Sequence, residues 1–211
     1  MDPYGTHIPI TNEILKAIPR ATPCAILEFG CGLFSTPIFR KHIESNPACT
    51  LISIESNVAW LDKVKTMYPE SPQHTYLDPA TFGSWSHAID HVLNVLIRDS
   101  KLWLSFIDSS PWDSRTIALF KLKEISELVL VHDCDYFPDT GLWGRRLTAG
   151  DPKTGHPHRE YGDVFKHWCE YMPTEMASPT GPPTLLGSNF QPITFSPIDT
   201  VVSSSSMPGP A

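Results

Sequence analysis

The 211-residue sequence lacks the features that mark several common protein classes. Its five cysteines form no CxxC pair and no zinc-type spacing, which argues against a zinc site or a disulfide scaffold and favours reduced thiols. No apolar run approaches the roughly 18 residues of a membrane span. The first residues, MDPYGTHIPIT, contain neither the basic nor the apolar part of a secretory signal. We therefore expect a cytoplasmic protein without a membrane partner.

Basic residues are also scarce. The chain has 16 Lys and Arg against 23 Asp and Glu, a formal net charge of −7. Such a balance disfavours nucleic acid as a partner, because phosphates need a local excess of positive charge. We find no internal repeat. The sequence thus favours a small-molecule ligand, and it predicts no particular oligomeric state.

Proline, in contrast, is abundant and unevenly placed, with ten of its 21 copies in residues 1–130 and eleven in residues 131–211. The stretch after residue 135 is rich in turn formers and too long for an ordinary connection, which is typical of lids and binding segments. We predict one domain over residues 1–191 with a lid-like insertion at about residues 136–160. A tail over residues 192–211 is predicted to be loosely held or disordered.

Short apolar runs alternate with segments of helical period through the first 130 residues. Five runs predict strands, and two more are predicted near the end of the domain, at residues 25–29, 51–55, 74–77, 102–108, 128–132, 168–172 and 184–187. Thr11, Ser35 and Ser56 are predicted to begin intervening helices. The alternation predicts an α/β fold, a Rossmann-like doubly wound sheet of about seven mostly parallel strands with helices on both faces.

The first predicted strand leads directly into Gly30-Cys31-Gly32-Leu33-Phe34-Ser35. Two glycines let the backbone turn tightly and approach a ligand, and Ser35 opens a helix whose N-terminal amides attract negative groups. Glu55 ends the next strand about 25 residues later, where a carboxylate can accept both hydroxyls of a ribose. The pattern indicates a nucleotide-cofactor loop, although a tight turn without a ligand and a plain surface glutamate are also compatible with it.

Glu28, two residues before Gly30, separates two cofactors that share this geometry. A dinucleotide places its pyrophosphate at the helix N-terminus, where a neighbouring carboxylate is repulsive. Beside the ammonium of an amino acid moiety the same carboxylate is attractive, directly or through water. The residues favour S-adenosylmethionine.

With these motifs the chain resembles the class I S-adenosylmethionine-dependent methyltransferases over roughly residues 5–190. THIPIT, EFGCGLFSTPIF, LISIES, FIDSS and VHDCDYF are similar to a subgroup of small methyltransferase-like proteins. The third loop glycine of the family pattern is missing. The resemblance implies that Glu28, Gly30 and Gly32 line the methionine part, that Glu55 binds the ribose and that Asp78 lies near the adenine. Cys31, Ser35 and Asp108 are also predicted to bind the cofactor. Asp78 is equally compatible with a turn former, and Trp85 with a stacking or a core residue.

Acidic residues follow the fourth and fifth predicted strands, at Asp108 and at His132-Asp133-Cys134-Asp135. The carboxyl ends of such strands face the ligand crevice. In one interpretation Asp108, Asp133 and Asp135 bind Mg²⁺, which lowers the pKa of a substrate hydroxyl, an arrangement similar to the catechol O-methyltransferase type. Cys134 replaces the amide of that type and is a poor ligand for a hard cation.

In the other interpretation no metal binds, and His132 or Asp108 acts as a general base. The predicted catalytic residues are therefore Asp108, His132 and Asp133. Arg115 is interpreted as part of a local ion pair at a helix start. Arg145 and Arg146, in the predicted lid, indicate either an anionic substrate or solvated side chains.

The sequence as a whole predicts an S-adenosylmethionine-dependent methyltransferase acting on a small molecule, at a hydroxyl oxygen rather than a nitrogen. Two other functions stay open. One is a catalytically inactive binding or accessory protein with the same fold, and the more distant one is a nicotinamide-dependent oxidoreductase.

Overall fold

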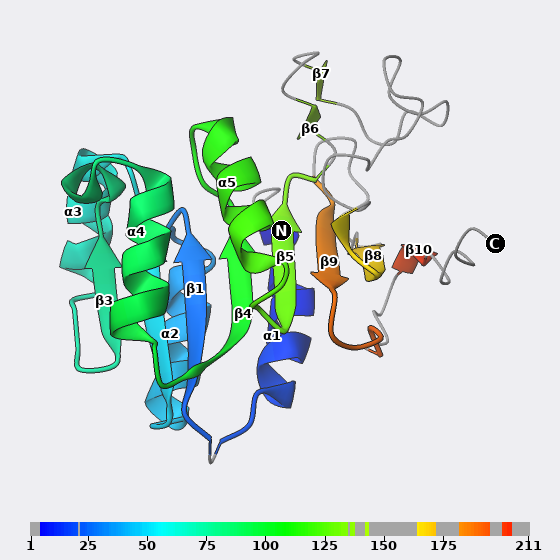
Figure 1. The fold of residues 1–211 in the computed structure, drawn as a ribbon, viewed down its shortest axis with the longest axis horizontal. Helices are drawn as coiled ribbons and strands as arrows, with labels where there is room; N and C mark the ends of the chain where they lie inside the picture. Colours follow the sequence, from blue (N-terminus) through cyan, green and yellow to red (C-terminus); the bar gives the residue numbers. More distant parts are fainter. Residues whose placement is uncertain are drawn as a thin grey trace.

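The computed structural model describes residues 5–20, 22–134, 136–137, 142–143, 164–171, 182–194 and 200–203. Its centre is an eight-stranded sheet (Figure 1). The strands are β1 (Cys24–Phe29), β2 (Cys49–Ile54), β3 (His74–Leu77), β4 (Lys101–Ile107), β5 (Leu128–His132), β8 (His167–Tyr171), β9 (Thr184–Ser188) and β10 (Thr200–Ser203).

The strand order is β10-β8-β9-β5-β4-β1-β2-β3. Strands β3, β2, β1, β4 and β5 are parallel to one another, whereas β9 is antiparallel to both β5 and β8. Because β1 lies between β2 and β4, the chain reverses its direction of travel across the sheet after β3. The crevice at such a reversal, beyond the carboxyl ends of the strands, is where open α/β sheets bind ligands.

Helices cover both faces of the sheet. They are α1 (Ile8–Ala17), α2 (Thr36–Ser45), α3 (Val58–Met67), α4 (Trp85–His91) and α5 (Trp112–Leu122), with the short turns η2 (Pro79–Phe82) and η3 (Val92–Leu96). In Figure 1, α4 and α5 lie in front of the sheet and α1 and α2 behind it. Alternate residues of each strand enter one of two cores, so Leu27 packs with Leu119 of α5 and Ile26 with Phe39 of α2. The predicted Rossmann-like α/β fold is confirmed.

Some element boundaries differ from the prediction. The first helix begins at Ile8, so Thr11 lies inside it and donates a hydrogen bond to the His7 carbonyl. The third helix is capped by Asn57, whose Oδ1 accepts from the amide of Trp60, and not by Ser56. Ser35 occupies the position before α2 as predicted, but its side chain makes no capping hydrogen bond there. Ser, Thr and Asn are nearly equivalent as helix caps, and tertiary packing decides which of them is used.

The tail predicted from residue 192 contributes β10, an antiparallel edge strand beside β8 that the sequence pattern does not predict. In the predicted insertion, β6 (Tyr136–Phe137) and β7 (Leu142–Trp143) form a separate two-stranded sheet. Its remaining residues, with Arg145 and Arg146, lie outside the described residues. Within the described parts of the chain, no helix has the length and apolarity to cross a membrane.

Candidate active site

A pocket of about 240 Å³ lies beyond the carboxyl ends of β1, β2, β4 and β5. Its wall combines the loop after β1 with the residues that follow three neighbouring strands and with the segment before α1. The lining residues are His7, Gly30, Cys31, Gly32, Leu33, Phe34, Ser35, Glu55, Asp108, Ser110, His132 and Asp133. Most of the residues that the sequence singles out thus meet in one place.

The two loop glycines have different roles. Gly30 has a φ of +84°, and a Cβ atom there would lie 2.4 Å from the carbonyl oxygen of Asp108. Gly30 therefore lets the end of β1 pass close to the end of β4. A Cβ on Gly32 would meet only the Ser35 Oγ, at 4.0 Å. The space beside Gly32 is open in the pocket wall, as a loop that admits a ligand close to its backbone requires.

Glu55 follows β2 and lines the pocket with a side chain that is almost fully buried. Its Oε1 accepts a hydrogen bond from the amide of Asn57 at 2.7 Å. Burial raises the pKa of Glu55, and hydrogen bonds from Asn57 and Ser56 oppose that shift. Burial also raises the pKa of the neighbouring Cys31 thiol, so Cys31 is a small apolar wall residue and not a nucleophile.

Glu28 is not part of the pocket wall in the described chain. It is fully buried behind the loop, where its carboxyl accepts hydrogen bonds from Thr36 Oγ1 at 2.9 Å and from Ser53 Oγ at 2.5 Å. Thr36 Oγ1 in turn accepts from the amide of Gly32 at 3.0 Å. Glu28 thereby fixes the loop from behind, and a contact with a cofactor stays a prediction.

Asp78 and Trp85 also lie away from the pocket wall. The carboxylate of Asp78 accepts from the amide of Ala80 at 2.8 Å and begins η2, which is the turn-forming role that the sequence leaves open. Trp85 packs partly buried against the core, with its ring 6.3 Å from that of Phe29. A contact of either residue with an adenine stays a prediction.

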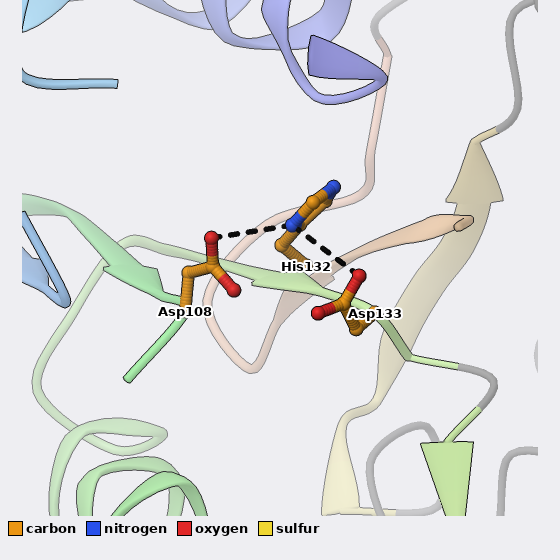
Figure 2. Close-up of side chains that lie close together, drawn as sticks. All are labelled: Asp108, His132 and Asp133. Carbon is orange, nitrogen blue, oxygen red and sulfur yellow. Dashed lines mark ion pairs between the residues drawn. The ribbon is translucent and has the colours of Figure 1, made fainter. Parts of the chain in front are cut away.

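Asp108, His132 and Asp133 converge at the ends of β4 and β5 (Figure 2). His132 Nδ1 lies 3.2 Å from Asp108 Oδ2 and 3.5 Å from Asp133 Oδ1. Successive residues of β5 point to opposite faces, and His132 shares a face with Leu130, which packs in the α1 core. This alternation directs the imidazole toward the segment before α1.

Both ring nitrogens of His132 face oxygen atoms that can accept a hydrogen bond. Thr6 donates its only hydroxyl hydrogen to the carbonyl of Pro182, at 2.6 Å, so His132 Nε2 must donate to Thr6 Oγ1, at 2.9 Å. Nδ1 faces the carboxylates of Asp108 and Asp133. A lone pair on Nδ1 would be repelled by their oxygens, whereas an N–H is attracted. Burial lowers the pKa of His132, but Asp108 and Asp133 outweigh burial and raise it above its usual value. These partners and the raised pKa favour the doubly protonated ring, and a role of His132 as a general base stays a prediction.

Arg115, near the start of α5, supplies the second positive charge. Its side chain is only 4% exposed. Nη2 lies 2.8 Å from Asp108 Oδ1 and 3.5 Å from Asp133 Oδ2, and the other guanidinium nitrogens donate to the carbonyls of Ser109 and His132. Two carboxylates are thus balanced by two cations, and the expected repulsion between the acids is relieved within the chain.

The two aspartates respond differently to this environment. Burial raises the pKa of Asp108, but the charges of His132 and Arg115 outweigh it and hold the pKa below its usual value. Burial raises the pKa of Asp133, and the negative charge of Asp108 raises it further. The positive charges of His132 and Arg115 lower it, but the net shift is upward. Asp133 also has a φ of +53°, a backbone conformation that Asp and Asn adopt more readily than most residues. Asp133 is the more basic of the two.

The donor set does not fit the predicted Mg²⁺ site. One oxygen or nitrogen from each of Asp108, His132 and Asp133 lies within 4.8 Å of the others. However, Mg²⁺ prefers oxygen ligands, the raised pKa of His132 favours a protonated ring, and Arg115 is paired with both carboxylates. Asp135, the third predicted ligand, lies outside the described residues. Arg115 takes the place that a cation would have.

Two residues of the site are not identified from the sequence. His7 lines the pocket although it precedes the first strand by 17 positions, and Arg115 is interpreted there only as a local ion pair. Neither has a local motif, because their positions depend on how α1 and α5 pack against the sheet. The THIPIT segment, which belongs to the resemblance, is the only signal at His7.

No family model and no curated protein matches this chain. Solved structures do match, among them one described as "PigF with SAH". It is 15% identical, and the alignment covers 85% of this chain with a TM-score of 0.40. This chain spans 61% of the length of that protein.

Proposed function

We propose that the protein is an S-adenosylmethionine-dependent methyltransferase that acts on a hydroxyl oxygen of a small molecule. The observation that carries the proposal is the composition of one pocket wall. A glycine loop at the end of β1, Glu55 at the end of β2 and the acidic residues after β4 and β5 all line it.

The cofactor half of the wall fits an adenosyl group better than a dinucleotide. The open space at Gly32 admits a ligand against the loop backbone, and Glu55 offers a carboxylate to ribose hydroxyls. Three carboxylates line the pocket, those of Glu55, Asp108 and Asp133. His132 beside them and Arg115 behind them offset the charges of the two aspartates, and the charge of Glu55 leaves the wall negative. A sulfonium and an ammonium are attracted by such a wall, and a pyrophosphate is repelled.

The sheet also departs from a dinucleotide-binding sheet. The usual order of that fold continues past the fifth strand with a further parallel strand. Here the antiparallel β9 is inserted beside β5. This difference and the acidic wall disfavour the nicotinamide-dependent oxidoreductase.

When bound, the cofactor supplies an electrophilic methyl group. The acceptor oxygen forms a bond to the methyl carbon, the carbon–sulfur pair returns to sulfur, and the hydroxyl proton leaves to a base. Asp133 is the best placed base, because it lines the pocket and its pKa is raised. Asp108, held by Arg115 and His132, keeps the imidazolium and the guanidinium in place.

Calorimetric titration with S-adenosylmethionine and S-adenosylhomocysteine tests the cofactor. We expect binding of both, and a loss of about tenfold or more for Glu55→Gln, because a charged hydrogen-bond acceptor is removed. Exposed Glu44 provides the control, since Glu44→Gln should bind as the wild type does. Absence of heat with both ligands at millimolar concentration would refute the proposal.

Turnover separates the enzyme from the accessory protein. S-adenosylhomocysteine release is followed with a panel of small hydroxyl compounds. Asp133→Asn keeps the backbone conformation and should retain cofactor binding but lose about a hundredfold in kcat. A protein that binds the cofactor and methylates no compound of a broad panel favours the accessory function.

A further inference from the structure

His7 is a buried side chain in the pocket wall to which the cofactor chemistry assigns no role. It lies directly before α1 and is 2% exposed. Its ring packs against Phe106, with centroids 4.9 Å apart, and stands edge-on to His132 at 4.8 Å. These contacts fix the ring at the same end of the pocket as Asp108 and His132.

Neither ring nitrogen of His7 has a hydrogen-bond partner among the described residues. The adjacent Thr6, in contrast, bonds to both His132 and Pro182. Buried polar groups are almost always paired, so a ring in the pocket wall with unpaired nitrogens is a candidate contact for a bound molecule. Here two nitrogens of one ring lack partners.

The ring is neutral. Burial and the positive charge of His132 lower the pKa of His7 to about 3, against a smaller opposing effect of Asp108. A neutral imidazole presents one N–H donor and one bare acceptor nitrogen. The two nitrogens point to different sides of the ring, so one hydroxyl meets one of them, as a donor to the bare nitrogen or as an acceptor from the N–H. A carboxylate can only accept.

The rest of the wall is consistent with a hydroxyl on an apolar body. Leu33 and Phe34 line the pocket, and Gly5, two residues before His7, has the Phe34 ring beside it. Asp133, the proposed base, lines the same pocket. His7 and Asp133 therefore line one cavity, which a single hydroxyl compound can occupy.

We propose that His7, in the pocket wall beside Asp108 and His132, binds the hydroxyl group of the methyl acceptor through one of its two unpaired ring nitrogens. The inference rests on the proposed function for the role of this hydroxyl compound as an acceptor. The binding site itself does not require methyl transfer.

Phenol and anisole are the probes, titrated by NMR into the protein with and without S-adenosylhomocysteine. They share an aromatic body, and only phenol carries a hydroxyl. We expect phenol to bind the wild type about tenfold more tightly than anisole and His7→Phe to remove this preference. His7→Gln, which keeps a donor and an acceptor, should restore part of it. Exposed His87 is the control, since His87→Phe should leave the ratio unchanged.

Thermal unfolding and cofactor affinity distinguish a binding role from a structural one. His7→Phe removes an unpaired buried polar group, so we expect an equal or higher Tm and an S-adenosylhomocysteine Kd within about twofold of the wild type. A fall in Tm accompanied by loss of cofactor binding would identify a structural residue and overturn the proposal. An unchanged phenol-to-anisole ratio in His7→Phe, or no preference in the wild type, would overturn it too.

The two proposals fail separately. A wild type that prefers phenol but does not bind S-adenosylhomocysteine retains the His7 site and refutes the methyltransferase. A wild type that binds S-adenosylhomocysteine but does not distinguish phenol from anisole refutes the His7 site and leaves the proposed methyltransferase in place.

Discussion

The carboxyl group of Glu28 joins three elements and has no solvent to stabilise its charge. It accepts from Thr36 of α2 and from Ser53 of β2, and Ser53 Oγ lies 2.9 Å from His74 Nε2 of β3. Burial raises the pKa of Glu28 to about 7; the hydrogen bonds of Ser35, Ser53 and Thr36 oppose the shift, and the charge of Asp108 adds to it. The loop therefore depends on a carboxyl that resists ionisation.

Replacing Glu28 with Gln tests this linkage. The raised pKa means that the folded protein binds the proton more tightly than the unfolded chain does, so stability is lost as pH rises from about 4.5 to about 7. The Glu28→Gln variant has no carboxyl to ionise at this position, so it does not lose this stability. Between pH 5 and 8 the free energy of unfolding should shift in favour of the variant by about 2 kcal/mol, measured by urea denaturation. Parallel curves for the two proteins would contradict the shift, and Glu44→Gln should follow the wild type.

Residues with a local pattern could be predicted, and residues placed by packing could not. Gly30, Gly32, Ser35 and Glu55 follow their strands at fixed spacing, and all four line the pocket. The protonation of His132 depends on a threonine 126 positions away and could not be read from the sequence. The position of Arg115 beside Asp108 and Asp133 also depends on packing. The sequence therefore predicted a metal ion as the positive charge between these aspartates.

At the scale of elements, the turn from β1 to α2 combines a structural and a ligand-facing glycine. Gly30 faces the backbone of the residue after β4, and its φ is positive. Gly32 faces open space. One Gly-x-Gly motif thus contains two positions at which the same substitution should affect different properties, stability at Gly30 and ligand binding at Gly32.

Alanine at each glycine separates the two roles. Gly30→Ala forces a Cβ into the Asp108 carbonyl and should lower the free energy of unfolding by about 3 kcal/mol. Gly32→Ala should change the free energy of unfolding by less than about 1 kcal/mol. It should weaken the binding of S-adenosylhomocysteine by about tenfold, because the added methyl group occupies space that the ligand needs. Denaturation and calorimetry on both variants provide the measurement. If Gly32→Ala binds as the wild type does, the cofactor does not lie against this loop.

At the scale of the whole molecule, the sheet was predictable because its strands are buried on both faces. Continuous runs such as LVLVH and CAILEF mark β5 and β1 without relying on a turn signal. β10 lacks such a signal, because an edge strand is specified by its partner β8 and not by its own pattern. Helix starts were less certain than strands, as Asn57 in place of Ser56 illustrates.

The net charge of −7 leads to a prediction about the ligand rather than the fold. S-adenosylmethionine carries one more positive charge than S-adenosylhomocysteine, on sulfur. Both the acidic wall and the negative molecule attract this charge, and salt screens such attraction over about 10 Å at 0.1 M. We expect the affinity for S-adenosylmethionine to fall about two- to threefold more than that for S-adenosylhomocysteine between 20 and 200 mM NaCl.

Nicotinamide dinucleotide provides the contrast, because its pyrophosphate is negative and the same field repels it. Weak dinucleotide binding should strengthen as salt rises, opposite in sign to the effect on the sulfonium ligand. S-adenosylhomocysteine, with the same body and no sulfonium charge, separates electrostatics from general salt effects on the protein. Equal salt dependence of the two adenosyl ligands would mean that the sulfur lies away from the carboxylates of Glu55, Asp108 and Asp133. The acceptor would then have to be sought at another part of the wall.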